Sequence, residues 1–193
     1  MKHQLLRVLG TGASAFLALA LIGTAAAQTT SSGPYYATPS WDQQLPASTR
    51  FVVLSNWVDS NFPSGGAAVL DRETGLVWER SPDTGLFGWP EAQSHCNNLR
   101  VGNRRGWRLP TIQELASLTD PTVPPPQVPL PAGHPFLSVQ GGFAVYWSAT
   151  TSATYPGDAW VMLVELGFFM ELDRTTAAEN VWCVRSAHGV DAQ

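Results

Sequence analysis

The chain has 193 residues and a formal net charge of −4, with 15 acidic residues against 11 basic ones. This acidic balance disfavours nucleic acid and anionic membranes as general partners. Only 13% of the residues are charged and eight are tryptophan, a composition typical of one mid-sized domain with an aromatic core.

The first 27 residues have the pattern of a secretory signal peptide. Lys2 and Arg7 precede an apolar run that ends in three alanines at 25–27. Polar and small residues interrupt this run, which disfavours the alternative of a membrane anchor. We expect cleavage after residue 27, no membrane span in the mature chain, and a periplasmic, extracellular or cell-surface location. Residues 28–49, rich in Thr, Ser, Pro and Gln, are expected to form a flexible leader.

Strands are predicted in the next part of the chain. Residues 50–54 are β-branched and aromatic, and residues 67–71 and 76–79 flank a Thr-Gly pair as the two arms of a hairpin. The carboxylates of Asp71 and Glu73 lie beside this turn. We interpret them as parts of a solvated turn.

Two helices follow the hairpin. Residues 89–99 have helical spacing of apolar residues, which places Cys96 on the buried face. Thr111 and Glu114 form a capping box, in which each side chain satisfies a backbone N–H group of the other residue at a helix start. This second helix is expected to end near Asp120, because the prolines that follow cannot continue it.

The rest of the chain predicts a long loop and further strands. Residues 121–142 contain many prolines and glycines, and the sequence leaves open whether this loop is functional or disordered. Strands are predicted at residues 144–150, 159–165, 168–172 and 181–185, and the weak alternation in the second of these indicates a central strand covered on both faces. We expect an α+β fold with two helices against a small, twisted, mainly antiparallel sheet.

Five motif blocks stand in a recognisable order along the chain. They are Thr74-Gly75-Leu76-Val77-Trp78, Trp107-Arg108-Leu109-Pro110-Thr111 with Glu114-Leu115, Tyr146-Trp147-Ser148-Ala149-Thr150, Ala159-Trp160, and Cys183-Val184-Arg185. With them the chain resembles the DUF1566 or Lcl C-terminal domain family, named after a Legionella collagen-like adhesin. The resemblance implies a C-type-lectin-like fold on secreted or surface bacterial proteins, related in architecture to the formylglycine-generating enzymes. The domain is expected to span residues 50–188, with 189–193 as a tail.

Cys96 and Cys183 are the only cysteines, and in an exported protein such a pair predicts a disulfide. The resemblance implies a link between the same two elements. Reactive thiols, as in the formylglycine-generating enzymes, are the alternative. We also expect five tryptophans to be core residues, because each lies in a strand or at the entry to a helix: Trp78, Trp107, Trp147, Trp160 and Trp182.

The residues form no recognisable catalytic or metal-binding pattern. His95, His134 and His188 lack the spacing of a zinc site. The calcium motifs of sugar-binding C-type lectins are absent, and Trp147-Ser148-Ala149 stands where the resemblance would place one of them. We expect no cofactor, no metal and no enzymatic activity.

The main electrostatic feature is a cluster of four arginines within nine residues, Arg100, Arg104, Arg105 and Arg108. Arginine forks match sulfate and carboxylate groups, and the resemblance implies binding of sulfated glycosaminoglycans. In the alternative interpretation, Arg108 is the structural partner of a carboxylate and the other three belong to a solvated loop.

We therefore expect an exported, adhesin-like recognition module that binds a glycan or a protein at its surface. The candidate ligand-binding residues are Arg100, Arg104, Arg105, His134 and Tyr146. One alternative is an enzyme related to the formylglycine-generating enzymes that acts on a partner polypeptide. Another is a diversified binding protein of a retroelement system, since some domains of the resembling family are targets of such systems.

Overall fold

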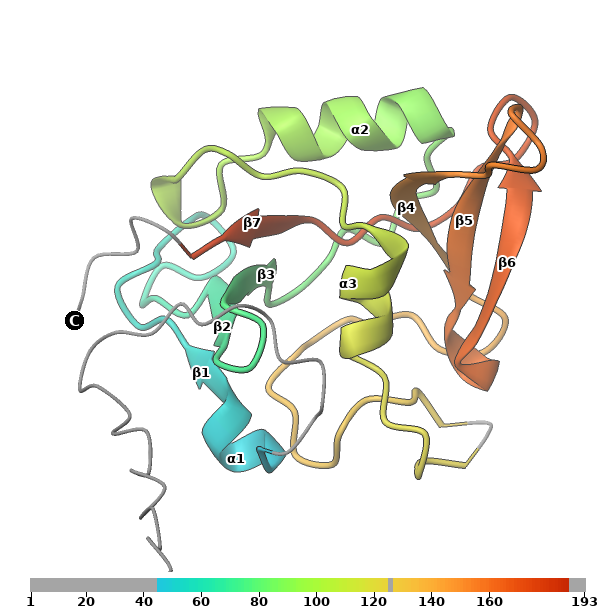
Figure 1. The fold of residues 1–193 in the computed structure, drawn as a ribbon. Helices are drawn as coiled ribbons and strands as arrows, with labels where there is room; N and C mark the ends of the chain where they lie inside the picture. The colour runs from blue at the N-terminus through green and yellow to red at the C-terminus, as the bar shows by residue number, and fades with distance from the viewer. Residues whose placement is uncertain (1–44, 125–126, 188–193) are drawn as a thin grey trace, which may run out of the picture. The chain divides into compact units, whose positions relative to one another are not determined.

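Two antiparallel sheets organise residues 45–124 and 127–187, the part of the chain that the computed structural model describes (Figure 1). The first sheet has the order β1-β2-β3-β7, with bounds Phe51–Val53, Ala68–Asp71, Leu76–Glu79 and Val184–Ser186. The second has the order β4-β5-β6, with bounds Val145–Thr151, Asp158–Leu163 and Phe168–Asp173. The helices are α1 (Ala47–Arg50), α2 (Trp89–Asn98) and α3 (Ile112–Ser117), with 3₁₀ turns at Val101–Asn103 and Val164–Leu166. The predicted α+β class is confirmed.

The expected signal peptide, most of the leader and the tail lie outside the described residues, as does His188. The end of the leader differs from the prediction, because residues 47–50 form α1. Ala47 is buried in the core, and the backbone N–H of Leu45 donates to Glu73 Oε1 at 2.6 Å. The domain therefore begins before residue 50.

Core residues cover both faces of β3 and of β5. Along β5, Ala159 and Val161 belong to one core cluster, whereas Met162 belongs to a second cluster on the other face. Along β3, Val77 belongs to the first of these clusters and Trp78 belongs to the second. This arrangement explains the weak polar alternation in the sequence of β5, because polar residues on either face would be buried.

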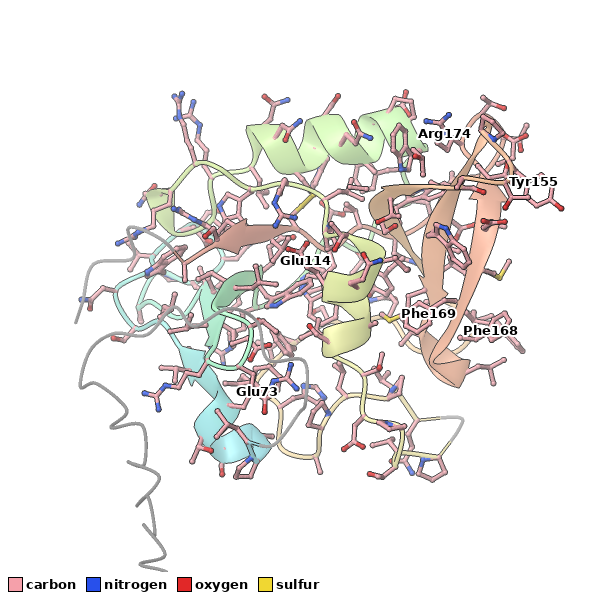
Figure 2. The ribbon with its side chains drawn as sticks, in the orientation of Figure 1. Glu73, Glu114, Tyr155, Phe168, Phe169 and Arg174 are labelled. Carbon is pink, nitrogen blue, oxygen red and sulfur yellow. A yellow bond between two sulfur atoms is a disulfide. The ribbon has the colours of Figure 1, made fainter. Side chains whose placement is uncertain are left out.

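Trp160 is not a core residue, contrary to the prediction. It is only half-buried and belongs to neither core cluster, although its neighbours Ala159 and Val161 are fully buried. Its cross-strand partner on β6 is Glu171, a charged residue on the outer strand of this sheet. The indole therefore lies outside both clusters. Farther along β6, Phe168 is 57% exposed (Figure 2).

The carboxylates of Asp71 and Glu73 are buried, which corrects the prediction of a solvated turn. Arg50 Nε and Nη2 donate to the two oxygens of Asp71 at 2.9 and 2.7 Å, and Arg50 Nη1 lies 3.2 Å from Glu73 Oε2. Arg50 Nη2 also donates to the carbonyl of Ser117 at 2.7 Å. A buried guanidinium requires such partners. This cluster ties α1 to the β2–β3 turn and to the end of α3, and Figure 2 places Glu73 beside α1.

The long loop after α3 packs against the second core cluster. The helix ends at Ser117, three residues before the predicted end at Asp120. Leu130 and Phe136 are 4% and 5% exposed, and the ring of Phe136 lies 4.9 Å from that of Trp182. These two side chains anchor the described part of the loop to the domain.

Residues 179–186, here called the crossing segment, join the two sheets. Asn180 N donates to Val145 O at 2.9 Å and Asn180 O accepts from Trp147 N at 3.1 Å, so the segment begins against β4. It ends as β7, which pairs with β3 and also exchanges two hydrogen bonds of 2.9 Å between Val184 and Arg108. The strand predicted at 181–185 is shorter in the structure because the chain passes from one sheet to the other there.

Candidate functional site

The Trp107 motif enters α3 through a capping box, as the sequence predicts. Glu114 N donates to Thr111 Oγ1 at 3.2 Å, and Thr111 N donates to Glu114 Oε2 at 2.8 Å. Arg108 pairs with the same carboxylate through both oxygens, at 2.7 and 2.6 Å. This hydrogen bonding raises the pKa of Arg108. Arg108 is therefore the partner of a structural carboxylate, and Figure 2 shows Glu114 at the start of α3.

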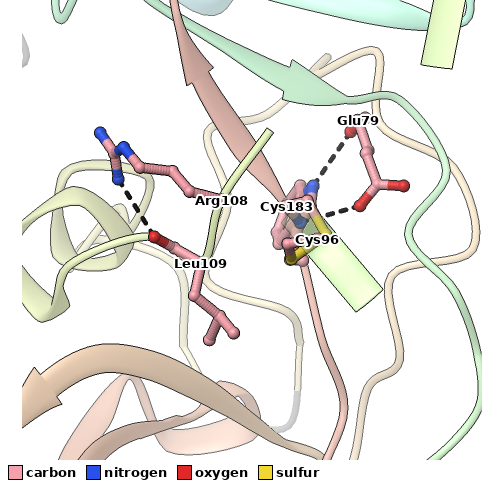
Figure 3. The surroundings of a disulfide bond; sticks show 6 residues. Glu79, Cys96, Arg108, Leu109 and Cys183 are labelled. Atoms are coloured by element: carbon pink, nitrogen blue, oxygen red, sulfur yellow. Dashed lines mark hydrogen bonds between the residues drawn. A yellow bond between two sulfur atoms is a disulfide. The ribbon is translucent and has the colours of Figure 1, made fainter. Parts of the chain in front are cut away.

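The predicted disulfide between Cys96 and Cys183 is confirmed. It joins α2 to the crossing segment with a Cα–Cα distance of 5.4 Å, and both cysteines are fully buried. Beside it, Cys183 N donates to Glu79 Oε2 at 2.8 Å (Figure 3). In addition, Glu79 N donates to Cys183 O at 3.2 Å. The side chain of Glu79 thus continues the β3–β7 ladder where the crossing segment leaves the sheet. Neither cysteine is a free thiol.

Two arginine side chains lie over the ring of one buried tryptophan, Trp57. The guanidinium carbon of Arg104 lies 4.2 Å from the ring centroid of Trp57, and that of Arg185 lies 5.4 Å from it. Trp57 is 1% exposed and packs edge-on against Trp107 at 6.2 Å. Gly102 permits this packing, because a Cβ atom there would lie 2.7 Å from the indole and its φ is +62°.

The arginine surface consists of Arg100, Arg104, Arg105 and Arg185. Arg100 and Arg104 flank the 3₁₀ turn Val101–Asn103, and Arg100 and Arg105 are exposed. Burial and the nearby positive charge of Arg104 lower the pKa of Arg185. The chain therefore holds two guanidinium groups against one indole.

Three of these four arginines stand out in the sequence as a local cluster, whereas Arg185 does not. This residue belongs to a family motif block but lies 80 positions after Arg105 in the chain. The pairing of β7 with β3 carries it to Trp57. No local sequence pattern indicates that contact.

Two other candidate ligand-binding residues, Tyr146 and His134, are fully or partly buried. Tyr146 is fully buried against Trp182, and its hydroxyl accepts from Gln140 N at 2.8 Å. It cannot contact a surface ligand, so this part of the prediction is wrong. His134 is half-buried and stacks on Phe136 at 5.9 Å, and burial lowers its pKa.

Four of the expected core tryptophans are buried to 2% exposure or less, and three of these donate their indole N–H to a carbonyl. Trp107 donates to Arg104 O at 3.0 Å, Trp147 to Phe87 O at 2.8 Å and Trp182 to Glu79 O at 2.9 Å. The fourth is Trp78, whose Nε1 has no hydrogen-bond partner in the described structure. The bonds of Trp147 and Trp182 join the aromatic core to segments distant in the sequence.

Within residues 45–124 and 127–187, no group of three His, Cys, Asp or Glu side chains could hold a metal ion. The helices in the same ranges are too short or too polar to cross a membrane.

The sequence profile of the Lcl C-terminal domain matches residues 67–185. The chain belongs to the Lcl C-terminal domain family. The matched span begins before β2 and ends in β7, so it includes both cysteines and the whole arginine surface, whereas Trp57 lies before it. A comparison with curated proteins finds no match. Family membership suggests that this Lcl C-terminal domain is secreted or on a surface, and its disulfide fits an extracellular or periplasmic location.

Proposed function

We propose that this Lcl C-terminal domain is an exported, adhesin-like recognition module that binds an anionic glycan without turning it over. The observation that carries the proposal is the pair of arginines held against Trp57, with Arg104 at 4.2 Å and Arg185 at 5.4 Å. Exposed Arg100 and Arg105 extend this positive surface on a chain whose net charge is −4.

The chemistry of the arginine surface favours sulfate or carboxylate groups. A guanidinium presents parallel N–H donors that match two oxygens of such an anion. Stacking on Trp57 limits the side-chain freedom of Arg104, so less conformational entropy is lost when it binds. Exposed charge pairs contribute only about 0.2 to 1 kcal/mol each and weaken with salt, so affinity is modest and falls with ionic strength.

Retention on immobilised heparin tests the proposal. Arg100→Gln with Arg105→Gln removes two exposed charges and should elute at clearly lower salt than the wild type. Adding Arg104→Gln should abolish retention. Because Arg104 packs on Trp57, Arg104→Lys serves as a variant that keeps the charge while changing the stacked group.

Arg72→Gln is the matched control, since Arg72 is an exposed arginine in the β2–β3 turn. It should elute at nearly the same salt concentration as the wild type, because it loses only one positive charge outside the arginine surface. Equal retention of the Arg100/Arg104/Arg105 variant and the wild type would show that these residues form only a solvated loop. Thermal denaturation of each variant confirms that the fold is intact.

The alternative of an enzyme related to the formylglycine-generating enzymes has less support. Both cysteines form the disulfide, so a reaction that uses a thiol would first require its reduction. Oxidation of a cysteine in a partner peptide by the purified protein would favour this alternative. A diversified binding protein would instead show sequence variation within the matched span among closely related genomes.

A further inference from the structure

We propose that a second site, the pocket beside the disulfide, binds a primary alkylammonium group, the chemistry of a lysine side chain or a diamine. The pocket has a volume of about 310 Å³ and lies between β3, α2 and the loops that follow β1 and β3. Its lining includes three carboxyl groups, from Asp59, Glu79 and Asp83. It shares none of its lining residues with the arginine surface, so the proposal does not depend on the function assigned there.

Glu79 is the central residue of this pocket. Its side chain is 3% exposed, and Oε2 accepts from Cys183 N at 2.8 Å. Within the described residues, Oε1 accepts no hydrogen bond, although Glu79 lines the pocket. A carboxyl oxygen in a pocket that the described part of the protein leaves without a partner is an acceptor available to a ligand.

His95 provides a second buried group without a partner. Its Nε2 atom is inaccessible to solvent and has no hydrogen bond in the described part of the chain. The imidazole lies on α2, lines the same pocket and packs against Phe87 at 4.6 Å. In its neutral form, a His ring nitrogen without a proton accepts a hydrogen bond. An ammonium group has three donors, so it can donate to Glu79 Oε1 and also to further acceptors of the lining.

Two further carboxylates stand in the lining. Asp59 Oδ1 accepts from the amides of Asn61 and Phe62, both at 2.9 Å, and Asp83 Oδ1 accepts from Gly85 N at 2.8 Å. These bonds fix each side chain and leave the second oxygen of each carboxylate for other contacts. Two carboxylates in one partly enclosed pocket concentrate negative potential there, which attracts cations.

The rest of the lining suits a short alkyl chain. Phe62, Ala67, Leu99 and Val101 supply apolar surface to the pocket. The nearby cation of Arg80 already donates to the carbonyls of Pro135 and Gly66, at 3.2 and 3.4 Å. A ligand ammonium would thus meet carboxyl groups while its methylenes contact the apolar wall, as lysine stems do in proteins.

Burial raises the pKa of Glu79 to about 8. The hydrogen bond from Cys183 N lowers this pKa, whereas the negative charges of Asp83 and Asp59 raise it further. Glu79 is therefore protonated at pH 7 in the free protein, and a bound ammonium would favour its ionised form. Other titratable groups near Glu79 are His95 on α2 and Tyr146 on β4, whose pKa is raised to about 12, mainly by burial. Binding is thus expected to release about one proton at pH 7 and to strengthen about tenfold per pH unit up to about pH 8.

Isothermal titration calorimetry of the mature protein with pentylamine tests the proposal. Titrations in two buffers of different ionisation enthalpy measure the released proton. The uncharged probe 1-pentanol should bind at least about tenfold more weakly. Cadaverine, N-acetyl-lysine methylamide and glucosamine then distinguish a diamine, a peptide side chain and an amino sugar as the natural source of the ammonium.

Glu79→Gln keeps an acceptor for Cys183 N but cannot ionise, and it should weaken pentylamine binding about thirtyfold or more and abolish proton release. Asp83→Asn changes an exposed carboxylate at the rim of the pocket and should weaken pentylamine binding about two- to fivefold. If Glu79→Gln fails to fold, Asp83→Asn tests the proposal in its place. Glu171→Gln on β6, the matched control, should bind as the wild type does.

Absence of pentylamine binding, or equal binding of the wild type and both pocket variants, overturns the proposal. Equal binding of pentylamine and 1-pentanol overturns it as well. Heparin retention provides an independent readout, because Glu79→Gln should leave it unchanged and the Arg100/Arg105 variant should bind pentylamine normally. Failure of one site is therefore distinguishable from failure of the other.

Discussion

Replacing Glu79 by Gln should stabilise the domain at neutral pH. Glu79 is 3% exposed, and the pKa of its carboxyl group is raised to about 8, mainly by burial, from an ordinary value of 4.5. In the unfolded chain the same group ionises near its ordinary pKa. Folding at pH 7 therefore requires Glu79 to take up a proton, and this uptake opposes folding.

The magnitude follows from the two pKa values. A group whose pKa is raised by folding contributes stability that is fully present below its unfolded pKa and is lost as pH rises through its folded pKa. Between pH 4 and pH 7 the wild type should thus lose about 3 kcal/mol from Glu79 alone. Gln has nearly the same shape as a protonated Glu and keeps an acceptor for Cys183 N, so the variant should avoid this loss.

Urea denaturation of both proteins at pH 4, 5, 6, 7 and 8 measures the difference. The free energies of unfolding should be similar at pH 4 and should diverge in favour of Glu79→Gln as the pH rises. Because all other titrating groups are common to the two proteins, their difference isolates Glu79. A constant difference across this range would show that Glu79 ionises normally, and a less stable variant at pH 7 would show that its charge supports the fold.

Two further stability predictions concern the disulfide and the buried arginine. Replacing both Cys96 and Cys183 by Ala removes a link across 87 positions and should cost about 4 to 5 kcal/mol by the chain-entropy model, measured by thermal or urea denaturation; an unchanged midpoint would show that the unfolded chain is already restricted. Asp71→Asn leaves the Arg50 guanidinium, 1% exposed, without its bidentate partner and should cost about 3 kcal/mol, with Glu73 limiting the loss. Glu171→Gln on β6 is the control for this variant, and an equal effect of the two changes would contradict the role given to Asp71.

Sequence patterns predicted the elements whose causes are local. The capping box of Thr111 and Glu114 lies within four residues, and the β2–β3 hairpin turns at Gly75, whose φ is 65°. Both depend on neighbouring residues alone. The disulfide was also predictable, because the chain contains only two cysteines.

Buried charges were not predictable in this way. The carboxylates of Asp71 and Glu73 resemble those of any polar turn, and only Arg50, 21 positions before Asp71, explains their burial. Glu79 has no apparent role in the sequence, although it lies beside the disulfide and lines the pocket. Tyr146 is a candidate ligand-binding residue by sequence, and its hydrogen bond with the Gln140 amide, which lies in an irregular loop, is not indicated by any local pattern. Such contacts depend on tertiary packing, which residue spacing does not encode.

The crossing segment also determines when the domain can fold. The hydrogen bond from Cys183 to Glu79 spans 104 positions, and the segment borders strands of both sheets. A chain that emerges from its N-terminus can form the β2–β3 hairpin early. Until residues 179–186 are free to pack, however, the first sheet lacks β7 and β4 lacks its contact with Asn180. Contacts between residues so distant in sequence slow folding, because the ends of a long loop must meet first. We expect a nascent chain that lacks this segment to remain sensitive to proteases and to acquire resistance only when the segment is present.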